Sequence, residues 1–322
     1  MENRKKAYLK YCVYLALLVA LVYGAGRLYF RVTGGFTEGN IKSELPYDER
    51  WVMPPLPAEQ KALVNSILSQ DFHYLGKGCQ SYVFLSADKK YVIKFIKYQR
   101  FRPQQWINYF SFIPAVEKYQ VNKTQEKRQK LDNLLAAWKL SYEHLKPETG
   151  LVYVHLNKSQ DLNKNLVIYD KLGLQHTLDL DQHEFLVQKR ADMLTKTITT
   201  YVDNGQVELA TSLVDRLIQM ILSEYARGFG DNDHALMQNT GVLDGEPIHI
   251  DVGQFVQKES FKEPKVYHQE LFSKTFKFRS WLNKHYPILE QHLNEELTEI
   301  IGPAMKTLKP QLKNMDECAS AI

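Results

Sequence analysis

The sequence predicts an α+β fold of two lobes, a strand-rich lobe followed by a larger, mainly helical one, behind an N-terminal transmembrane helix. Residues 11 to 26 are almost all apolar and carry no charge. Residues 72 to 97 alternate β-branched and aromatic runs with turn residues, which is typical of antiparallel strands. Apolar residues at three- and four-residue spacing between 206 and 227, and helical patterns beyond residue 256, indicate helices.

Length and composition bound the class of protein. A chain of 322 residues has room for one large domain or two smaller ones packed together, and 44% hydrophobic residues exclude a disordered chain. A net charge of +4 favours anionic membrane surfaces or phosphorylated ligands. Nucleic-acid binding ordinarily shows a denser basic patch, so no nucleic-acid partner is expected. Because Cys12, Cys79 and Cys318 lie far apart in the sequence, we expect neither a disulfide framework nor a zinc site.

Residues 8 to 30 form the predicted membrane helix. The uncharged stretch is slightly short for a span, but the flanking Lys10 and Arg27 can extend their charged ends to the interface. We favour a single-pass anchor because aromatic residues lie at both ends of the segment. A cleaved signal peptide is the alternative, since small residues follow the apolar run, and a buried soluble helix is the third. Basic residues on both sides leave the orientation, and so the side of the globular part, open.

The chain divides into four predicted segments. Residues 1–31 are the anchor. Residues 32–60, which hold two adjacent glycines, the Pro54-Pro55 pair and Pro57, form a linker that stands the globular part off the membrane. Residues 61–190 form the smaller lobe and residues 191–322 the larger.

A glycine turn precedes two predicted strands in the smaller lobe. Gly76-Lys77-Gly78 comes before the strand Tyr82–Leu85, and its bare backbone can approach phosphate oxygens closely. The next strand, Tyr91–Ile96, carries Lys94, whose long side chain can reach the same phosphates. A helix over residues 115 to 145 and further strands follow, at 151–156, 165–171 and 184–190.

An acidic loop carries the first candidate site residues of the larger lobe. The helix over residues 206 to 227 leads into Asp231-Asn232-Asp233, three polar residues that are costly to bury without a partner. Eighteen residues after Asp233, the apolar strand Ile248-His249-Ile250 ends at Asp251. Gly253 then lets the backbone turn. The Asp251 carboxylate is thereby expected at the rigid end of a strand, where it could bind a metal ion that is itself bound to phosphates.

These motifs together resemble the protein-kinase-like superfamily. The glycine turn resembles its phosphate loop, with Ser81 in place of the third glycine, and Val92-Ile93-Lys94 resembles its strand lysine motif. The motif around Asp251 most resembles that of phosphoinositide-kinase-like enzymes; it reads His249-Ile250-Asp251-Val252-Gly253-Gln254-Phe255. No Ala-Pro-Glu motif follows it, so the peptide-docking segment of typical protein kinases is not visible.

The resemblance implies a bilobal kinase-like fold that binds ATP and Mg²⁺. It implies that Lys94 holds the α- and β-phosphates and that a helix glutamate, Glu126 or else Glu143, orients it. It implies that Asp233, with Asp231 as the competing candidate, accepts or orients the proton of the acceptor hydroxyl.

The metal and nucleotide contacts follow from the same resemblance. Asp251 binds Mg²⁺ together with Asn239 or Gln238. The nucleotide is bound by the glycine loop with Ser81, by Lys94, and by the hinge residues Gln188 and Arg190.

We therefore predict a membrane-anchored, ATP-dependent phosphotransferase acting on a lipid, glycan, small-molecule or protein hydroxyl. The alternative is a catalytically weak pseudokinase that serves as a membrane-tethered nucleotide-binding or scaffolding module. A third reading is an anchored α+β protein unrelated to kinases, in which Lys94 and Asp251 lie far apart.

Overall fold

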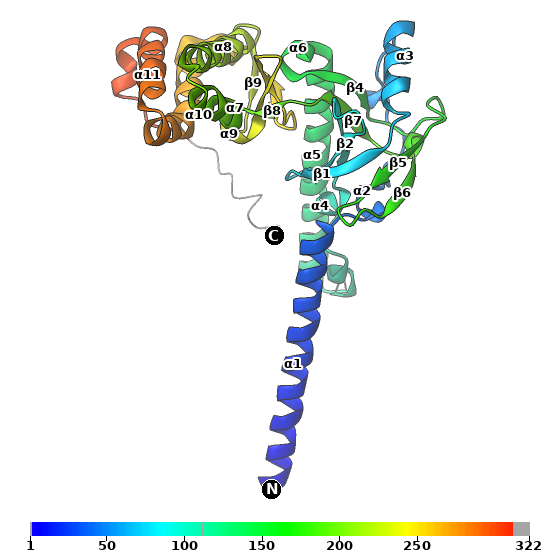
Figure 1. The fold of residues 1–322 in the computed structure, drawn as a ribbon. Coiled ribbons are helices and arrows are strands. Elements are labelled where there is room, and N and C mark those ends of the chain that lie inside the picture. Colours follow the sequence, from blue (N-terminus) through cyan, green and yellow to red (C-terminus); the bar gives the residue numbers. More distant parts are fainter. Residues whose placement is uncertain (1, 111, 312–322) are drawn as a thin grey trace.

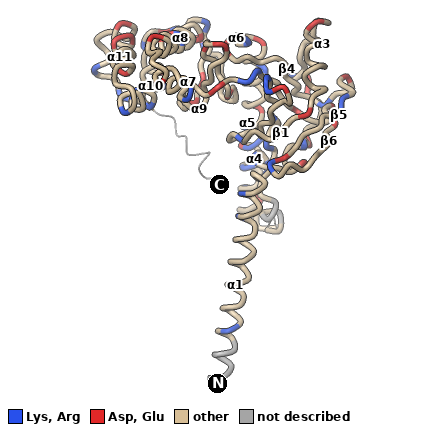
Figure 2. The backbone as a smooth tube through the Cα atoms, viewed as in Figure 1, with Lys and Arg blue, Asp and Glu red and all other residues tan. Residues whose placement is uncertain are grey.

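The computed structural model describes residues 2–110 and 112–311. Two lobes sit at one end of a long helix, α1 (Glu2–Thr33), which extends away from both (Figure 1). Helix α1 is long and apolar enough over Tyr8–Thr33 to cross a membrane, and none of its most apolar window is buried. Figure 2 shows almost the whole described length of α1 free of charged residues, while charges of both signs cover the lobes.

The smaller lobe is built on a seven-stranded sheet with the order β4-β7-β3-β2-β1-β5-β6. The neighbouring strands pair antiparallel except β1 and β5, which are parallel. Strand β6 was not predicted, since its segment reads as polar. The strands are β1 (Phe72–Lys77), β2 (Ser81–Ser86), β3 (Tyr91–Ile96), β4 (Leu151–His155), β5 (Asn165–Tyr169), β6 (Gln175–Asp179) and β7 (Phe185–Lys189).

Period-two patterning explains why this sheet has a buried face. In β2, Tyr82 and Phe84 point into the core while their neighbours are only partly buried. Phe95 and Phe185 continue the same core across β3 and β7. The sheet therefore holds Lys94, in the middle of β3, on a rigid support.

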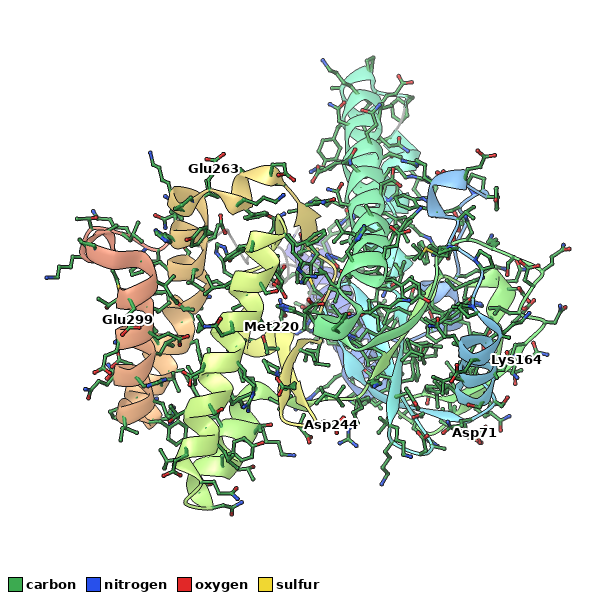
Figure 3. The ribbon with its side chains drawn as sticks, turned by 90° about the horizontal axis from the view of Figure 1, so that it is seen from above. Asp71, Lys164, Met220, Asp244, Glu263 and Glu299 are labelled. Atoms are coloured by element: carbon green, nitrogen blue, oxygen red, sulfur yellow. The ribbon has the colours of Figure 1, made fainter. Side chains whose placement is uncertain are left out.

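Helix α5 (Pro114–His144) connects the two lobes. Its buried residues begin only at Leu131, and from there its apolar face packs on β4 and on the strand β12 (Phe255–Gln257) of the larger lobe. Seen from above, the helices near Met220 and Glu299 lie apart from the strands near Asp71 and Lys164, and α5 projects beyond both groups (Figure 3).

The larger lobe is mainly helical. Its core comes chiefly from α7 (Leu194–Asp203), α8 (Val207–Ala226), α10 (Pro264–His285) and α11 (Pro287–Ile301). Two small sheets, β11-β10-β8 and β12-β9, lie toward the smaller lobe and carry the acidic loop. Their strands are β8 (Asp192–Met193), β9 (Phe229–Asp231), β10 (Thr240–Leu243) and β11 (Glu246–His249).

Short helices complete the described chain. The α-helical ones are α2 (Glu38–Ile41), α3 (Ala58–Ile67), α4 (Tyr98–Phe101), α6 (Lys146–Thr149) and α9 (Leu236–Asn239). The 3₁₀ turns are η1 (Glu49–Trp51), η2 (Gln105–Phe110), η3 (Leu180–Gln182), η4 (Glu259–Lys262) and η5 (Gly302–Lys306). A strand lobe with one long helix, followed by a helical lobe and preceded by an apolar N-terminal helix, confirms the predicted α+β arrangement of two lobes.

Two expectations from the sequence are wrong. The segment expected to be a linker is packed into the fold, since Phe36, Ile41 and Trp51 are all buried and Phe36 meets the rings of Tyr82 and Phe84 edge-on. Prolines and glycines there shape a folded strap, which sequence composition does not distinguish from a flexible linker. The cysteines also depart from expectation because Cys79 is disulfide-bonded, whereas Cys12 is a free thiol.

Candidate functional site

Lys94 and Asp251 come from different lobes and meet in one site. Lys94 Nζ donates a hydrogen bond to the carbonyl oxygen of Ile250, one residue before Asp251. Burial raises the pKa of Asp251, with Asp231 and Asp233 adding to the effect, while the Lys94 ammonium and the Gly253 N–H oppose it. Burial likewise lowers the pKa of Lys94, and Asp251 opposes that change. The third reading, in which Lys94 and Asp251 lie far apart, is therefore wrong.

The two aspartates of the acidic loop have different surroundings. Asp231 is buried at the end of β9, where Oδ2 lies 3.0 Å from Lys274 Nζ and Oδ1 accepts the Asp233 N–H at 3.0 Å. Asp233 is partly exposed, and its Oδ1 accepts the Ala235 N–H at 2.9 Å. Asp231 is thus paired with Lys274, whereas Asp233 presents a partly exposed carboxylate.

The structure separates the two candidates for the metal-binding amide. Asn239 is buried at the end of α9, and its carbonyl oxygen accepts the Ile250 N–H at 2.8 Å, which places it beside Asp251. Gln238 is exposed. Of the two, Asn239 is the residue that lies next to the carboxylate.

The glycine loop leaves open space beside its backbone. A Cβ added at Gly76 would meet nothing within 4 Å, and one at Gly78 would make only ordinary contacts with Ser81 at 3.8 and 4.0 Å. The Gly78 N–H donates to the Ser81 carbonyl at 2.9 Å, which closes the turn. Lys97 Nζ donates to the Gly78 carbonyl from the other side. Burial, together with Lys77 and Arg100, lowers the pKa of Lys97 to about 8.

The glycine loop also reaches the Asp251 turn. A Cβ added at Gly253 would lie 2.3 Å from Gln80 Oε1 and 2.9 Å from Leu134 Cδ1 of α5. Gly253 therefore allows close packing, because a side chain there would push aside the Gln80 amide and the Leu134 methyl group. The glycine loop, α5 and the Asp251 turn therefore pack against one another.

These residues fit a divalent cation bound to phosphates. Burial raises the pKa of Asp251, and the nearby carboxylates of Asp231 and Asp233 add to that rise, so three acidic side chains lie close together here. Carboxylate and amide oxygens are the donors that Mg²⁺ prefers, and Lys94 supplies a cation on the opposite side. The bare backbone at Gly76 and Gly78 completes the set.

The structure does not bring Glu126 to Lys94, contrary to expectation. Glu126 lies on the exposed amino-terminal half of α5, where it pairs with Lys123 at 2.6 Å and Lys130 at 3.1 Å. These partners lower its pKa to about 2. Glu143, the other candidate, is exposed in the last turn of the same helix. The α5 residue that meets the turn at Gly253 is Leu134.

The two expected hinge residues lie at the end of β7 and just beyond it. Gln188 is buried, and its amide donates to the carbonyls of Thr149 at 2.6 Å and His249 at 2.8 Å. Its side chain joins the two lobes. The side chain of Arg190 is exposed just beyond β7.

Sequence reasoning missed two lysines of the site. Lys274 lies 43 positions after Asp231, inside an aromatic and basic stretch that reads as ordinary helix, so no local signal marks it. Lys97 follows the strand lysine by three residues and was not singled out. A cavity of about 480 Å³ lies elsewhere, between the strap around Trp51 and Met53 and the end of β4 near His155.

Comparisons with known proteins find similarity only to solved structures. No family model matches the chain, and no curated protein matches it in sequence. The structure is similar to a crystal structure of WbdD, a protein described as a bifunctional kinase-methyltransferase, with 14% identity and a TM-score of 0.36. That match covers 77% of this chain and 49% of that one.

Two further structures are similar at the same level. A co-crystal structure of WbdD with the kinase inhibitor LY294002 has 15% identity and a TM-score of 0.34, over 73% of this chain and 48% of that one. The complex of Rv3197 with erythromycin, from Mycobacterium tuberculosis, has 13% identity and a TM-score of 0.32. That match covers 93% of this chain and 87% of that one. The chain spans about half the length of the WbdD chains it matches. Scores this low identify no function for this chain.

Proposed function

We propose that the chain is a membrane-anchored, ATP-dependent phosphotransferase. The observation that carries the proposal is the meeting of Lys94, from the smaller lobe, with three carboxylates of the larger lobe beside an open glycine loop. A cation and clustered acids facing each other across two lobes suit a substrate that is itself a polyanion carrying a divalent cation. Helix α1 is the proposed anchor.

Each residue of the site has a role in this proposal. The backbone of Gly76 and Gly78 receives phosphate oxygens, and Lys94 exchanges its bond to the Ile250 carbonyl for the phosphates. Asp251 and Asn239 hold Mg²⁺, which when bound neutralises charge that develops on the transferred phosphoryl group. Glu126 is no longer part of the proposed site.

Asp233 is the proposed base. It accepts the proton of the acceptor hydroxyl while the hydroxyl oxygen bonds to the terminal phosphorus and the bond to the nucleoside diphosphate breaks. Its partly exposed carboxylate can reach an acceptor, whereas both oxygens of Asp231 are already bound. Asp231 instead positions the loop through Lys274 and the Asp233 N–H.

A pseudokinase is the second candidate, and a specific observation favours it. Lys94 donates to a backbone carbonyl, and the helix face beside the site presents Leu134 in place of the usual glutamate. A nucleotide-binding module without turnover needs the same glycine loop and Asp251 but not a correctly oriented lysine.

The first test measures nucleotide binding by thermal shift of the full chain in nanodiscs, with and without Mg²⁺. Stabilisation by ATP with Mg²⁺ is expected in the wild type and lost in Asp251→Asn. Asp244→Asn is the matched control because Asp244 is exposed, at φ +52° in the neighbouring hairpin, where asparagine is well tolerated. A wild type that no nucleotide stabilises contradicts both candidates.

The second test separates enzyme from pseudokinase. In the enzyme, Asp233→Asn lowers phosphate transfer or ATP hydrolysis by roughly 10²–10⁴-fold while Mg²⁺-dependent binding is retained. Binding without any turnover in the wild type, on lipid, glycan, small-molecule and protein acceptors alike, supports the pseudokinase.

A further inference from the structure

An apolar surface lies outside the nucleotide site, where η2 leads into α5. Tyr109 and Phe112 are 80% and 78% exposed, and Ile113 is 39% exposed. We call these three residues the aromatic loop. Further along the exposed part of α5, Tyr119 and Val121 are 51% and 50% exposed. Large apolar side chains gathered at one projecting end indicate a contact surface, because single exposed residues are normally scattered.

The aromatic loop lies on the side of the molecule from which α1 leaves. It begins shortly after α4, and Arg102 ties this segment to the strap that follows α1, donating to the carbonyls of Gly39 at 3.0 Å and Lys42 at 2.7 Å. In Figure 1 the coil around η2 hangs below the sheet, level with the domain end of α1. The loop and α1 therefore point toward the same surface.

The exposed half of α5 that follows the aromatic loop is basic. From Pro114 to Lys130 no described residue is buried. This stretch holds five basic residues (Lys118, Lys123, Lys127, Arg128 and Lys130) and two acidic ones (Glu117 and Glu126), an excess of three positive charges. Aromatic residues next to a basic helix are the combination that lies at a water–lipid interface with anionic headgroups.

We propose that the aromatic loop and the basic half of α5 form a second membrane contact. Tyr109, Phe112 and Ile113 enter the interfacial region of the bilayer, and the lysines of α5 lie against anionic lipid headgroups. The inference rests on the proposed function only for the role of α1 as the anchor. Continuity with α1 and the positive charge favour a bilayer over a protein partner as the occupant of this surface.

The second contact fixes the smaller lobe over the bilayer. The Lys77 ammonium of the glycine loop already lies 3.8 Å from the ring centroid of Phe30 near the end of α1. One helix alone leaves the lobe free to rotate about its axis, whereas two contacts hold it in one orientation. The glycine loop then stays near the membrane surface, where an acceptor carried by a lipid is within reach.

The test measures membrane depth in the full chain in nanodiscs of phosphatidylcholine and phosphatidylserine. An environment-sensitive fluorescent amino acid replaces Cys12, Phe112 or Ile288, one at a time, and lipids with quenchers on their acyl chains are added. Cys12 reports on α1, and Ile288, which is 67% exposed on α11, is the aqueous control. Blue-shifted, quenched emission is expected at positions 12 and 112, and unquenched emission at 288.

The possible outcomes are distinct. Quenching at position 12 without quenching at position 112 overturns the second contact. If neither position is quenched, the role of α1 as the anchor is overturned as well. Nucleotide binding is measured separately, so the nucleotide site is judged independently of this result. The same label at Tyr109 gives a second reading that does not depend on position 112. Replacing phosphatidylserine with phosphatidylcholine is expected to reduce the quenching at 112 and leave that at 12 unchanged, and equal quenching in both lipids overturns the role of the α5 lysines.

Discussion

Lys274 Nζ lies 3.0 Å from Asp231 Oδ2, and the two side chains are only 3% and 2% exposed. Lys274 reaches the acidic loop from α10, so this pair joins the helical core to the loop that carries Asp233. A buried charge without its partner is costly, because the protein interior solvates it poorly.

Removing the lysine should therefore destabilise the protein strongly. We expect Lys274→Met to lower the free energy of unfolding by roughly 3–5 kcal/mol, since Asp231 is left buried and unpaired. Denaturant unfolding followed by circular dichroism measures this change. Lys284→Met is the control, because Lys284 is exposed on the same helix. The double variant Lys274→Met/Asp231→Asn should recover part of the loss, and strict additivity of the two changes would argue against the pair.

Alanine substitutions at two glycines of the site should have different effects, one on nucleotide binding and the other on stability. Gly76→Ala meets open space and should leave unfolding unchanged, but it should weaken Mg²⁺–nucleotide binding by about tenfold, or 1.4 kcal/mol, because the methyl group stands where phosphate approaches. Gly253→Ala meets Gln80 and Leu134 and should destabilise the unliganded protein by roughly 1–3 kcal/mol. Thermal unfolding with and without nucleotide distinguishes the two effects. Unchanged nucleotide affinity in Gly76→Ala would remove the glycine loop from the proposed site.

Local pattern predicted much of the fold and part of the site. Strand β3 and the helices α5 and α8 were found within a residue or two, because alternation and helical spacing are read from adjacent residues. The helix partner of Lys94 was not predictable in this way. Glu126 has a suitable position in sequence, but only the half of α5 from Leu131 onward packs against the rest of the chain, and Glu126 lies on the projecting half.

Contacts between distant segments account for the other misses. The bonds of the Gln188 side chain to carbonyls on both sides of the lobe junction were not foreseen from the sequence. Lys274 gains its role only when folding brings α10 to Asp231 at the end of β9. The hydrogen-bond partners of polar groups in a crowded site are set by the tertiary structure. The spacing of residues in a single sequence does not show them.

The strap after α1 should behave as core in stability measurements. Phe36→Ala removes a ring that is 3% exposed and should cost roughly 3–5 kcal/mol in unfolding free energy. Val52→Ala, at a position 45% exposed in the same strap, should cost less than about 0.5 kcal/mol. Chemical denaturation of both variants in the same detergent measures the difference. Equal, small losses would mean that the segment is a linker after all.

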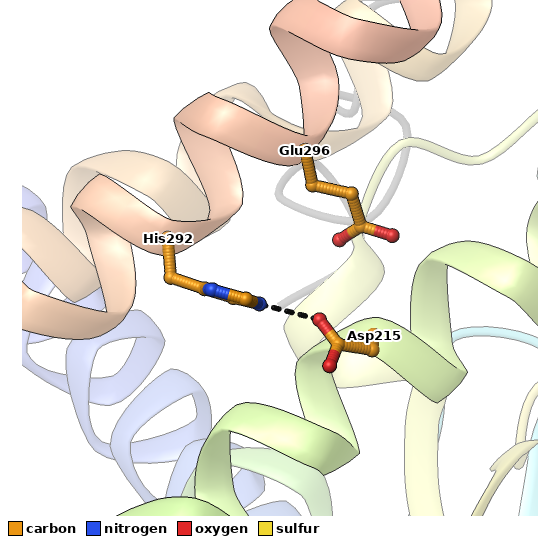
Figure 4. A group of neighbouring side chains, drawn as sticks. All are labelled: Asp215, His292 and Glu296. Carbon is orange, nitrogen blue, oxygen red and sulfur yellow. Dashed lines mark hydrogen bonds and ion pairs between the residues drawn. The ribbon is translucent and has the colours of Figure 1, made fainter.

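A cluster between α8 and α11 should make stability depend on pH. Asp215 faces His292 and Glu296, which lie one turn apart on α11 (Figure 4). His292 Nε2 pairs with Asp215 Oδ1 at 2.5 Å, while Glu296 Oε2 is buried without a hydrogen-bond partner among the described residues. Burial, with the charges of Asp215 and Glu299 outweighing that of His292, raises the pKa of Glu296 from 4.5 to about 7.

The direction of the pH effect follows from that rise. Because the folded chain holds the Glu296 proton more tightly than the unfolded chain does, the stabilisation is complete below pH 4.5 and is lost as the pH rises through about 7. Glu296→Gln stays neutral, so it should match the wild type at low pH and exceed it at pH 8 by about 1 kcal/mol, a modest value because the carboxyl is only half-buried. Melting curves across this range measure the gain as a rise in Tm of roughly 2–4 °C. Glu295→Gln, at the exposed neighbouring position, should show no such trend, and a trend shared by both variants would assign the effect to overall charge.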